Sequence, residues 1–122
     1  MAYINPVFLW CNFKLLKMNW IALIVAGIFE IGWPLGLKMA QHPGGSKLGW
    51  VVLAIVSMSI SGGLLFYAQK TIPIGTAYAV WTGLGAVGTL LVGIVFFNDS
   101  ANVFRLLSAT LIVAGIIGLK IF

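Results

Sequence analysis

The sequence contains very few charged residues. Only 7% of its 122 residues are Asp, Glu, Lys or Arg, and two of these are acidic. Long polar stretches are missing as well, since 61% of the residues are hydrophobic and the mean hydropathy is +1.12. Four apolar stretches and their short connections use nearly the whole chain from Met18 onward. This composition leaves no room for a soluble domain and predicts an integral membrane protein.

Residues that carry site chemistry are also scarce. The single cysteine, Cys11, excludes an internal disulfide, and no Cys/His cluster has metal-ligand spacing, so we expect no metal and no cofactor. A Ser/His/Asp set, a glycine-rich phosphate loop and a nucleic-acid motif are all missing, so an enzyme is not expected. The net charge of +5 comes from basic residues mostly at the ends of apolar stretches. Contact with lipid headgroups explains this charge better than binding to nucleic acid does.

Windows of about 20 apolar residues, the length that a membrane-spanning helix needs, occur four times. We therefore expect an all-α fold with four transmembrane helices, at about residues 20–39, 48–68, 75–97 and 103–122. Residues 1–17 do not fit this pattern, because Met18-Asn19-Trp20 resembles a natural protein start just before the first helix. We interpret 1–17 as an N-terminal extension from an upstream mis-start, with a short interfacial segment as the alternative, and 18–122 as one four-helix domain.

One carboxylate lies inside the first apolar stretch. From Trp20 to Leu37 every residue except Glu30 is apolar, aromatic, Gly or Pro. An acidic group near the middle of a membrane span costs roughly 2.5–3.5 kcal/mol on insertion scales. Only a function or a buried partner keeps so costly a group, and a structural hydrogen bond between helices is the plainer alternative. We interpret Glu30 as the functional carboxylate.

The third span carries a polar and aromatic stripe. Tyr78, Trp81, Thr82 and Gly85 follow i, i+3, i+4, i+7 spacing and share one helix face. We expect this stripe to donate hydrogen bonds to Glu30 and to give a cation an aromatic wall, although an interfacial aromatic belt is the alternative. Glycine lowers helix propensity, so a bend in this span is predicted at three positions. These hinge positions are Gly83, Gly85 and Gly88.

The remaining spans carry small residues and hydroxyl groups. Ser57 and Ser61 share a face of the second span, and Gly62 beside them allows another helix to approach closely. In the fourth span a small residue recurs every four positions, which predicts a packing ridge between protomers. This ridge consists of Thr110, Ala114 and Gly118. Asp99 in the third connection is interpreted as an ordinary carboxylate at the start of the fourth helix.

The distribution of Lys and Arg gives only a weak instruction for orientation. The terminal side of the four spans holds Lys70 and Lys120, joined by Lys14 and Lys17 if the extension is included. The opposite side holds Lys38, Lys47 and Arg105. Because neither side has a clear excess, the chain could insert both ways, and two opposed copies could pair.

Several motifs together resemble the small multidrug resistance transporters, and most closely their guanidinium-exporter branch. They are Gly27-x-x-Glu30-x-x-Trp33 followed by Leu37-Lys38, the block from Pro73 to Gly83, and the closing segment from Gly115 to Lys120. The resemblance covers Met18 to the C-terminus. It implies an antiparallel, dual-topology homodimer in a bacterial inner membrane that exchanges protons for guanidinium by alternating access.

By motif position the resemblance also assigns roles to residues. Glu30 would be the shared proton and cation site, oriented by Trp33, Tyr78 and Trp81, with Ser61 as the hydroxyl of the second span and Ser57 as its substitute. Gly27, Ser57, Gly62 and Thr82 would support the site. The partners expected are a small organic cation, protons, the lipid bilayer and a second copy of the chain.

Pro34 departs from the small residue expected after Trp33. Its missing N–H would have bonded the carbonyl of Glu30, so we expect a break in the helix at the functional carboxylate and count Pro34 among the hinge positions. Two alternatives to a guanidinium exporter stay open for the function of the protein. The protein could export bulkier quaternary ammonium ions, which need aromatic contact but no planar hydrogen-bond match. It could instead be a structural or regulatory membrane subunit that transports nothing.

Overall fold

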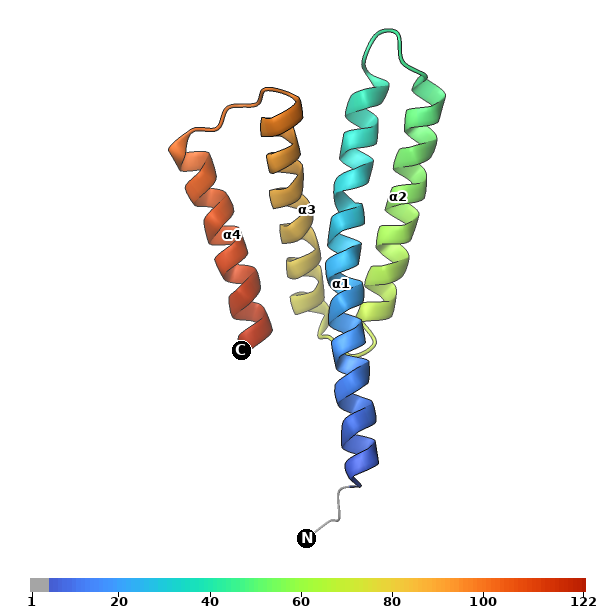
Figure 1. Ribbon diagram of the computed structural model, residues 1–122, viewed down its shortest axis with the longest axis vertical. Coiled ribbons are helices and arrows are strands. Elements are labelled where there is room, and N and C mark those ends of the chain that lie inside the picture. The colour runs from blue at the N-terminus through green and yellow to red at the C-terminus, as the bar shows by residue number, and fades with distance from the viewer. Residues whose placement is uncertain (1–4) are drawn as a thin grey trace.

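The computed structural model describes residues 5–122, and all of its regular structure is helical (Figure 1). The first four residues of the predicted extension lie outside this range. The helices are α1 (Pro6–Ala40), α2 (Lys47–Ala68), α3 (Ile74–Phe96) and α4 (Val103–Ile121). Each is long and apolar enough to cross a membrane. The prediction of an all-α chain with four transmembrane helices is therefore confirmed.

Helix α1 is much longer than the span predicted at residues 20–39. The side chain of Asn5 accepts a hydrogen bond from the Val7 N–H at 3.0 Å, and Pro6 occupies the first turn, where a missing N–H costs nothing. With 35 residues α1 is about 52 Å long, against about 30 Å for the hydrocarbon core of a bilayer. Residues 5–18 are exposed, and Figure 1 shows this part of α1 extending beyond the other helices.

Successive helices run antiparallel, which gives the protomer two distinct ends (Figure 1). The terminal end carries both termini and the α2–α3 connection, and the two-loop end carries the α1–α2 and α3–α4 connections. Basic residues occur at both ends. They are Lys14, Lys17, Lys70 and Lys120 at the terminal end, and Lys38, Lys47 and Arg105 at the two-loop end.

Helix α1 packs between α2 and α3, and small residues make the close contacts. A Cβ built on Gly36 would lie 3.0 Å from the backbone oxygen of Trp50, and one built on Gly32 would overlap Ser57. Van der Waals contact between backbones is the main source of helix association in lipid, so these positions hold α2 tightly on α1. An apolar cluster closes the terminal end. Its buried members are Ala22, Leu23, Ala68, Ile72, Ala77 and Val80.

Helix α4 packs mainly against α3, and the Lys120 ammonium lies 5.4 Å from the centre of the Trp20 ring on α1. A Cβ on Gly83 would lie 2.9 Å from Ile116 Cδ1, so α3 faces α4 with a glycine at this point. The ridge predicted to pack between protomers is not used within this one. Thr110 and Ala114 are exposed, and a Cβ on Gly118 would meet nothing within 4 Å. The ridge stays a prediction.

The interpretation of Asp99 as a helix-start carboxylate is wrong. The side chain of Asn102 caps α4, accepting the Arg105 N–H at 2.9 Å. Asp99 instead belongs to the end of α3, where its N–H and that of Phe97 both donate to the Gly93 carbonyl, at 3.1 and 3.0 Å. Asn98 between them has a φ of 56°, a left-handed conformation that asparagine tolerates better than most residues.

Candidate functional site

Glu30 lies half-buried on α1 between α2 and α3. Its Oε2 accepts a hydrogen bond from Ser61 Oγ on α2 at 3.0 Å. On the other side, a Cβ on Gly85 of α3 would lie 2.6 Å from Glu30 Cγ. The stem of the glutamate therefore fits only because residue 85 has no side chain. The Glu30 carboxylate is therefore positioned by the hydroxyl group of Ser61 and by the space that Gly85 leaves.

Ser61 connects three helices through one hydroxyl group. It is fully buried, accepts the indole N–H of Trp81 at 2.8 Å, and lies 2.7 Å from the Ala26 carbonyl as well as 3.0 Å from Glu30. A hydroxyl group has a single proton to donate. It can therefore serve the Ala26 carbonyl or the Glu30 carboxylate, but not both fully. A charged carboxylate is the stronger acceptor, so the charge on Glu30 decides the choice.

A groove of about 360 Å³ opens beside Glu30. Trp33 contributes an aromatic wall, and its Nε1 is buried without a hydrogen-bond partner among the residues that the structure describes. An unpaired buried donor costs about 1–3 kcal/mol, so this N–H would gain from an acceptor that a shift of the surrounding side chains brought to it. The other residues that line the groove are Pro34, Thr82, Gly85, Ala86 and Thr89.

Tyr78 is not brought to Glu30 within the protomer. Its side chain is 56% exposed, and its ring contacts that of Trp81 with 5.4 Å between the centroids and a tilt of 54°. The predicted stripe is therefore divided between two surroundings. Trp81 and Gly85 face the interior, Thr82 lines the groove, and Tyr78 points to the exterior of this chain.

The supporting positions also separate into two groups. Ser57 lies one turn away from Ser61, and its hydroxyl donates to the Phe29 carbonyl at 2.6 Å instead of to the carboxylate. A Cβ on Gly27 would lie 2.7 Å from Leu84 Cβ, so this glycine lets α3 approach α1. Gly62 is exposed, and a Cβ there would meet nothing within 4 Å. Ser57 and Gly27 hold the helices together, whereas Gly62 faces outward.

The expected break of α1 at Pro34 is wrong. Helix α1 continues through Pro34 to Ala40, because the φ of proline suits a helix and only one backbone hydrogen bond is lost. The donor that is lost is the one that would bond the Glu30 carbonyl.

Helix α3 is also continuous, and two of its glycines are explained by close packing. Gly85 faces Glu30, and a Cβ on Gly88 would overlap Ile31. The hinge roles stay predictions.

Sequence reasoning missed Thr89 and Ala86 as residues of the groove. Thr89 lies one turn beyond Gly85 and two turns beyond Thr82, so extending the predicted stripe of α3 by one turn would have found it. Ala86 carries no such signal, because an alanine in an apolar span looks like any other packing residue.

The sequence model of the Small Multidrug Resistance protein family matches residues 18–112. Three curated relatives are each named guanidinium exporter, and each aligns over 104 residues, 85% of this chain. The protein of Proteus vulgaris is 53% identical over 98% of its length. Those of Salmonella typhimurium and Escherichia coli K12 are 52% and 51% identical over 97% of their lengths.

These matches confirm the resemblance that the motifs predicted. Four membrane-length helices together with bacterial relatives of this kind also confirm the expected location, a multi-pass position in the bacterial inner membrane. The chain belongs to the small multidrug resistance family.

Proposed function

We propose that this protein exports guanidinium and small substituted guanidinium cations in exchange for protons. The observation that carries the proposal is Glu30, a carboxylate inside a membrane span that is held by Ser61 and opens on an aromatic groove. The relatives that are about half identical to this chain are named guanidinium exporters. The protein is accordingly a transporter and not an enzyme.

The carboxylate of Glu30 supports exchange because the same group can bind either a proton or a guanidinium cation. A carboxyl group carries either a proton or a negative charge. A guanidinium ion competes for the deprotonated form, since its planar N–H donors match a carboxylate with two parallel hydrogen bonds. If Glu30 holds a proton or a cation but not both, and opens to one side of the membrane at a time, a proton gradient drives export.

A second, antiparallel copy of the chain would complete the site. Two features support this part of the proposal. Tyr78 faces outward next to Trp81, and most of α4 is exposed because it packs mainly against α3. The weak bias of Lys and Arg between the two ends is compatible with opposite orientations.

Two forces decide between guanidinium and quaternary ammonium substrates. A hydrogen bond to a charged group contributes about 1.5–3 kcal/mol, whereas each buried methylene of an alkylated cation adds about 0.8 kcal/mol. A few carbons can therefore replace one hydrogen bond where the groove admits them. We expect guanidinium and singly substituted guanidines to be transported, and small hydrophobic ammonium ions to be weaker substrates.

Proton-coupled uptake in proteoliposomes tests the proposal. Glu30→Gln keeps the shape of the side chain and removes its charge, so exchange should be abolished while the protein stays inserted and dimeric. Ser59→Ala is a matched control, because Ser59 is exposed and its hydroxyl bonds only the Ile55 carbonyl of its own helix. Transport by Glu30→Gln at the parental rate would overturn the mechanism.

Displacement of a reporter cation by tetrapropylammonium, with no competition from millimolar guanidinium, would favour the quaternary ammonium exporter. A structural subunit would transport neither.

A further inference from the structure

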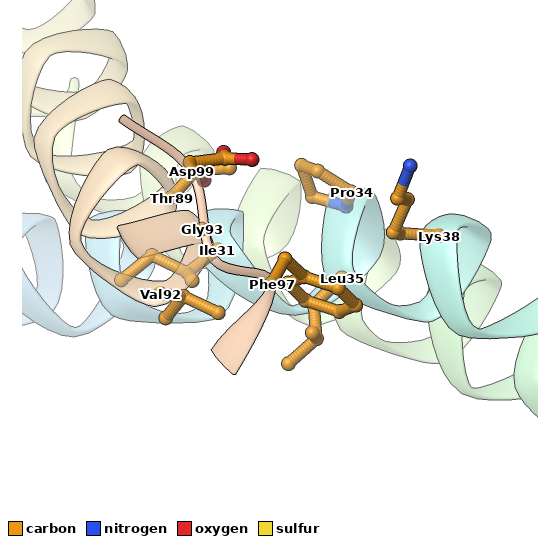
Figure 2. Close-up of a pocket in the computed structure, with 9 residues that line it drawn as sticks. All are labelled: Ile31, Pro34, Leu35, Lys38, Thr89, Val92, Gly93, Phe97 and Asp99. Atoms are coloured by element: carbon orange, nitrogen blue, oxygen red, sulfur yellow. The ribbon is translucent and has the colours of Figure 1, made fainter. Parts of the chain in front are cut away.

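A second cavity, of about 280 Å³, lies between α1 and α3 at the two-loop end (Figure 2). Asp99, Lys38 and Phe97 are among the residues that line it. Pro34 and Thr89 line both this cavity and the groove beside Glu30. The two spaces therefore adjoin along α1 and α3.

The two acidic residues of the chain lie in these two adjoining spaces. The sequence contains only two, Glu30 and Asp99, and one lines each space. Lys38, at the level of the outer cavity, follows Glu30 by eight residues on α1, which is about 12 Å along the helix. A cation that enters from the two-loop end would thus pass Asp99 first and then meet Glu30 near the middle of the span.

A backbone turn places Asp99, an exposed residue, on the wall of this cavity. Gly93 is buried beneath it, and a Cβ on Gly93 would overlap Asp99 Oδ2. The turn through Asn98 ties the Asp99 N–H to the Gly93 carbonyl at 3.1 Å. Figure 2 shows the Asp99 carboxylate and the Lys38 amine on the same side of the cavity, with Pro34 between them. A glycine and a left-handed residue therefore place an exposed carboxylate on the wall of this cavity.

We propose that Asp99 forms an outer cation site, at which guanidinium binds weakly on its way to or from Glu30. This inference rests on the proposed function and adds a second binding position to it. Lys38 is the basic residue of the cavity, so its ammonium competes with the cation for Asp99. The planar guanidinium makes two parallel hydrogen bonds to a carboxylate, whereas an ammonium acts as a point charge. The hydroxyl of Thr89, on the shared wall, is an acceptor between the two carboxylates.

Transport kinetics test the outer site. Electrostatic attraction into a cleft raises association rates by about 10–1000-fold, and salt weakens it. In Asp99→Asn proteoliposomes at low salt, kcat/KM for guanidinium should fall about tenfold at an unchanged kcat, and its dependence on salt should weaken. Asp99→Glu should restore most of the loss. Gln41→Lys, with its orientation measured by tag accessibility in the same vesicles, is the control, because it changes the net charge by the same amount in an exposed loop at the same end.

Binding in lipid nanodiscs separates the outer site from the inner one. In Glu30→Gln, titration with guanidinium chloride should shift the amide resonances of Asp99 and Thr89 by NMR, while equal sodium chloride should not. The shifts should be lost in Glu30→Gln/Asp99→Asn. They should saturate at lower guanidinium in Glu30→Gln/Lys38→Gln than in Glu30→Gln/Lys47→Gln, which loses the same charge outside the cavity.

Parental kcat/KM and salt dependence in Asp99→Asn, or titrations of Glu30→Gln without shifts at Asp99, would overturn the outer site. An effect of Gln41→Lys as large as that of Asp99→Asn, at an orientation mixture that matches the parental chain, would do the same, because surface charge alone would then explain the loss. Failure of the proposed function has a different signature, namely transport that persists in Glu30→Gln.

Discussion

Ser61 Oγ lies 3.0 Å from Glu30 Oε2 and 2.7 Å from the carbonyl oxygen of Ala26, with one proton for the two acceptors. Trp81 donates to the same oxygen at 2.8 Å. If Glu30 binds a proton or a cation, we expect the hydrogen bonding of the α1 backbone and of Trp81 on α3 to change with it. This coupling gives a local event at the carboxylate a direct path into the contacts between three helices.

Replacing Ser61 by alanine should impair transport more than replacing Ser57. Ser61→Ala removes the donor to Glu30 and leaves the buried Trp81 N–H without its acceptor, a loss of about 1–3 kcal/mol. We expect kcat/KM for guanidinium to fall about tenfold or more. Ser57→Ala removes a bond to the Phe29 carbonyl only, so it should lower thermal stability and leave kcat/KM within about twofold.

Uptake assays and melting curves on both serine variants decide this point. The sequence offered Ser57 as the substitute for Ser61, because the two share a helix face. A larger transport defect in Ser57→Ala than in Ser61→Ala would make Ser57 the hydroxyl of the site and contradict the assignment of that role to Ser61.

Gly85→Ala should disturb the site, whereas Gly88→Ala should disturb only packing. A Cβ at position 85 would meet Glu30 Cγ at 2.6 Å, so the carboxylate must move. A Cβ at position 88 would overlap Ile31, which lines the outer cavity but not the groove beside Glu30. Both variants should melt at a lower temperature in detergent, because overpacking lowers the free energy of unfolding by about 1–3 kcal/mol. Only Gly85→Ala should raise the Kd for guanidinium, measured by tryptophan fluorescence, and equal Kd changes would contradict this.

The four helices could be predicted because composition and span length constrain a membrane protein strongly. In lipid every backbone polar group must be satisfied within a helix or closed barrel, so 20 apolar residues leave little choice. The hydrogen bond between Ser61 and Glu30 was accessible for a related reason, whereas Trp81, which was expected to donate to Glu30, donates to Ser61 instead. A few polar groups in apolar spans must find one another, and the family resemblance indicated which ones.

Two features could not be predicted because they depend on tertiary packing. The place of Asp99 follows from the Asn98 turn and from Gly93, and a sequence of Asn-Asp-Ser before a helix reads equally well as an ordinary cap. The glycines of α3 suggested bending, since low helix propensity is visible in a sequence. The side chains of Glu30 and Ile31 that these glycines accommodate are visible only in the folded chain.

Pro34→Ala should stabilise α1 and change transport. An alanine supplies the N–H that the Glu30 carbonyl lacks, and a proline inside a helix costs about 3 kcal/mol. The melting temperature should therefore rise. If α1 flexes at this position during alternating access, the maximal transport rate should fall while the equilibrium Kd stays within about twofold. Melting curves, uptake and Kd on the same preparation test this, and a lower melting temperature would contradict it.

Orientation in the membrane should respond to very few added charges. The terminal end carries Lys14, Lys17, Lys70 and Lys120, and the two-loop end carries three basic residues, so neither end dominates. Two lysines appended after the exposed Phe122 should bias the chain toward one orientation. Gln41→Lys/His42→Lys, in the exposed α1–α2 loop, should bias it toward the other. Accessibility of a terminal tag in intact cells and in lysed cells reports the distribution.

Transport should then require both orientations together. If the active unit is an antiparallel pair, each biased variant alone should have low activity, because it finds few partners of opposite orientation. Expression of the two variants in one cell should restore guanidinium resistance, since their charges select opposite orientations and their site residues are intact. A single orientation for the parental chain, or full activity of either biased variant alone, would rule out the antiparallel pair. Activity that stays low in the co-expressing cells would point instead to damage by the added lysines.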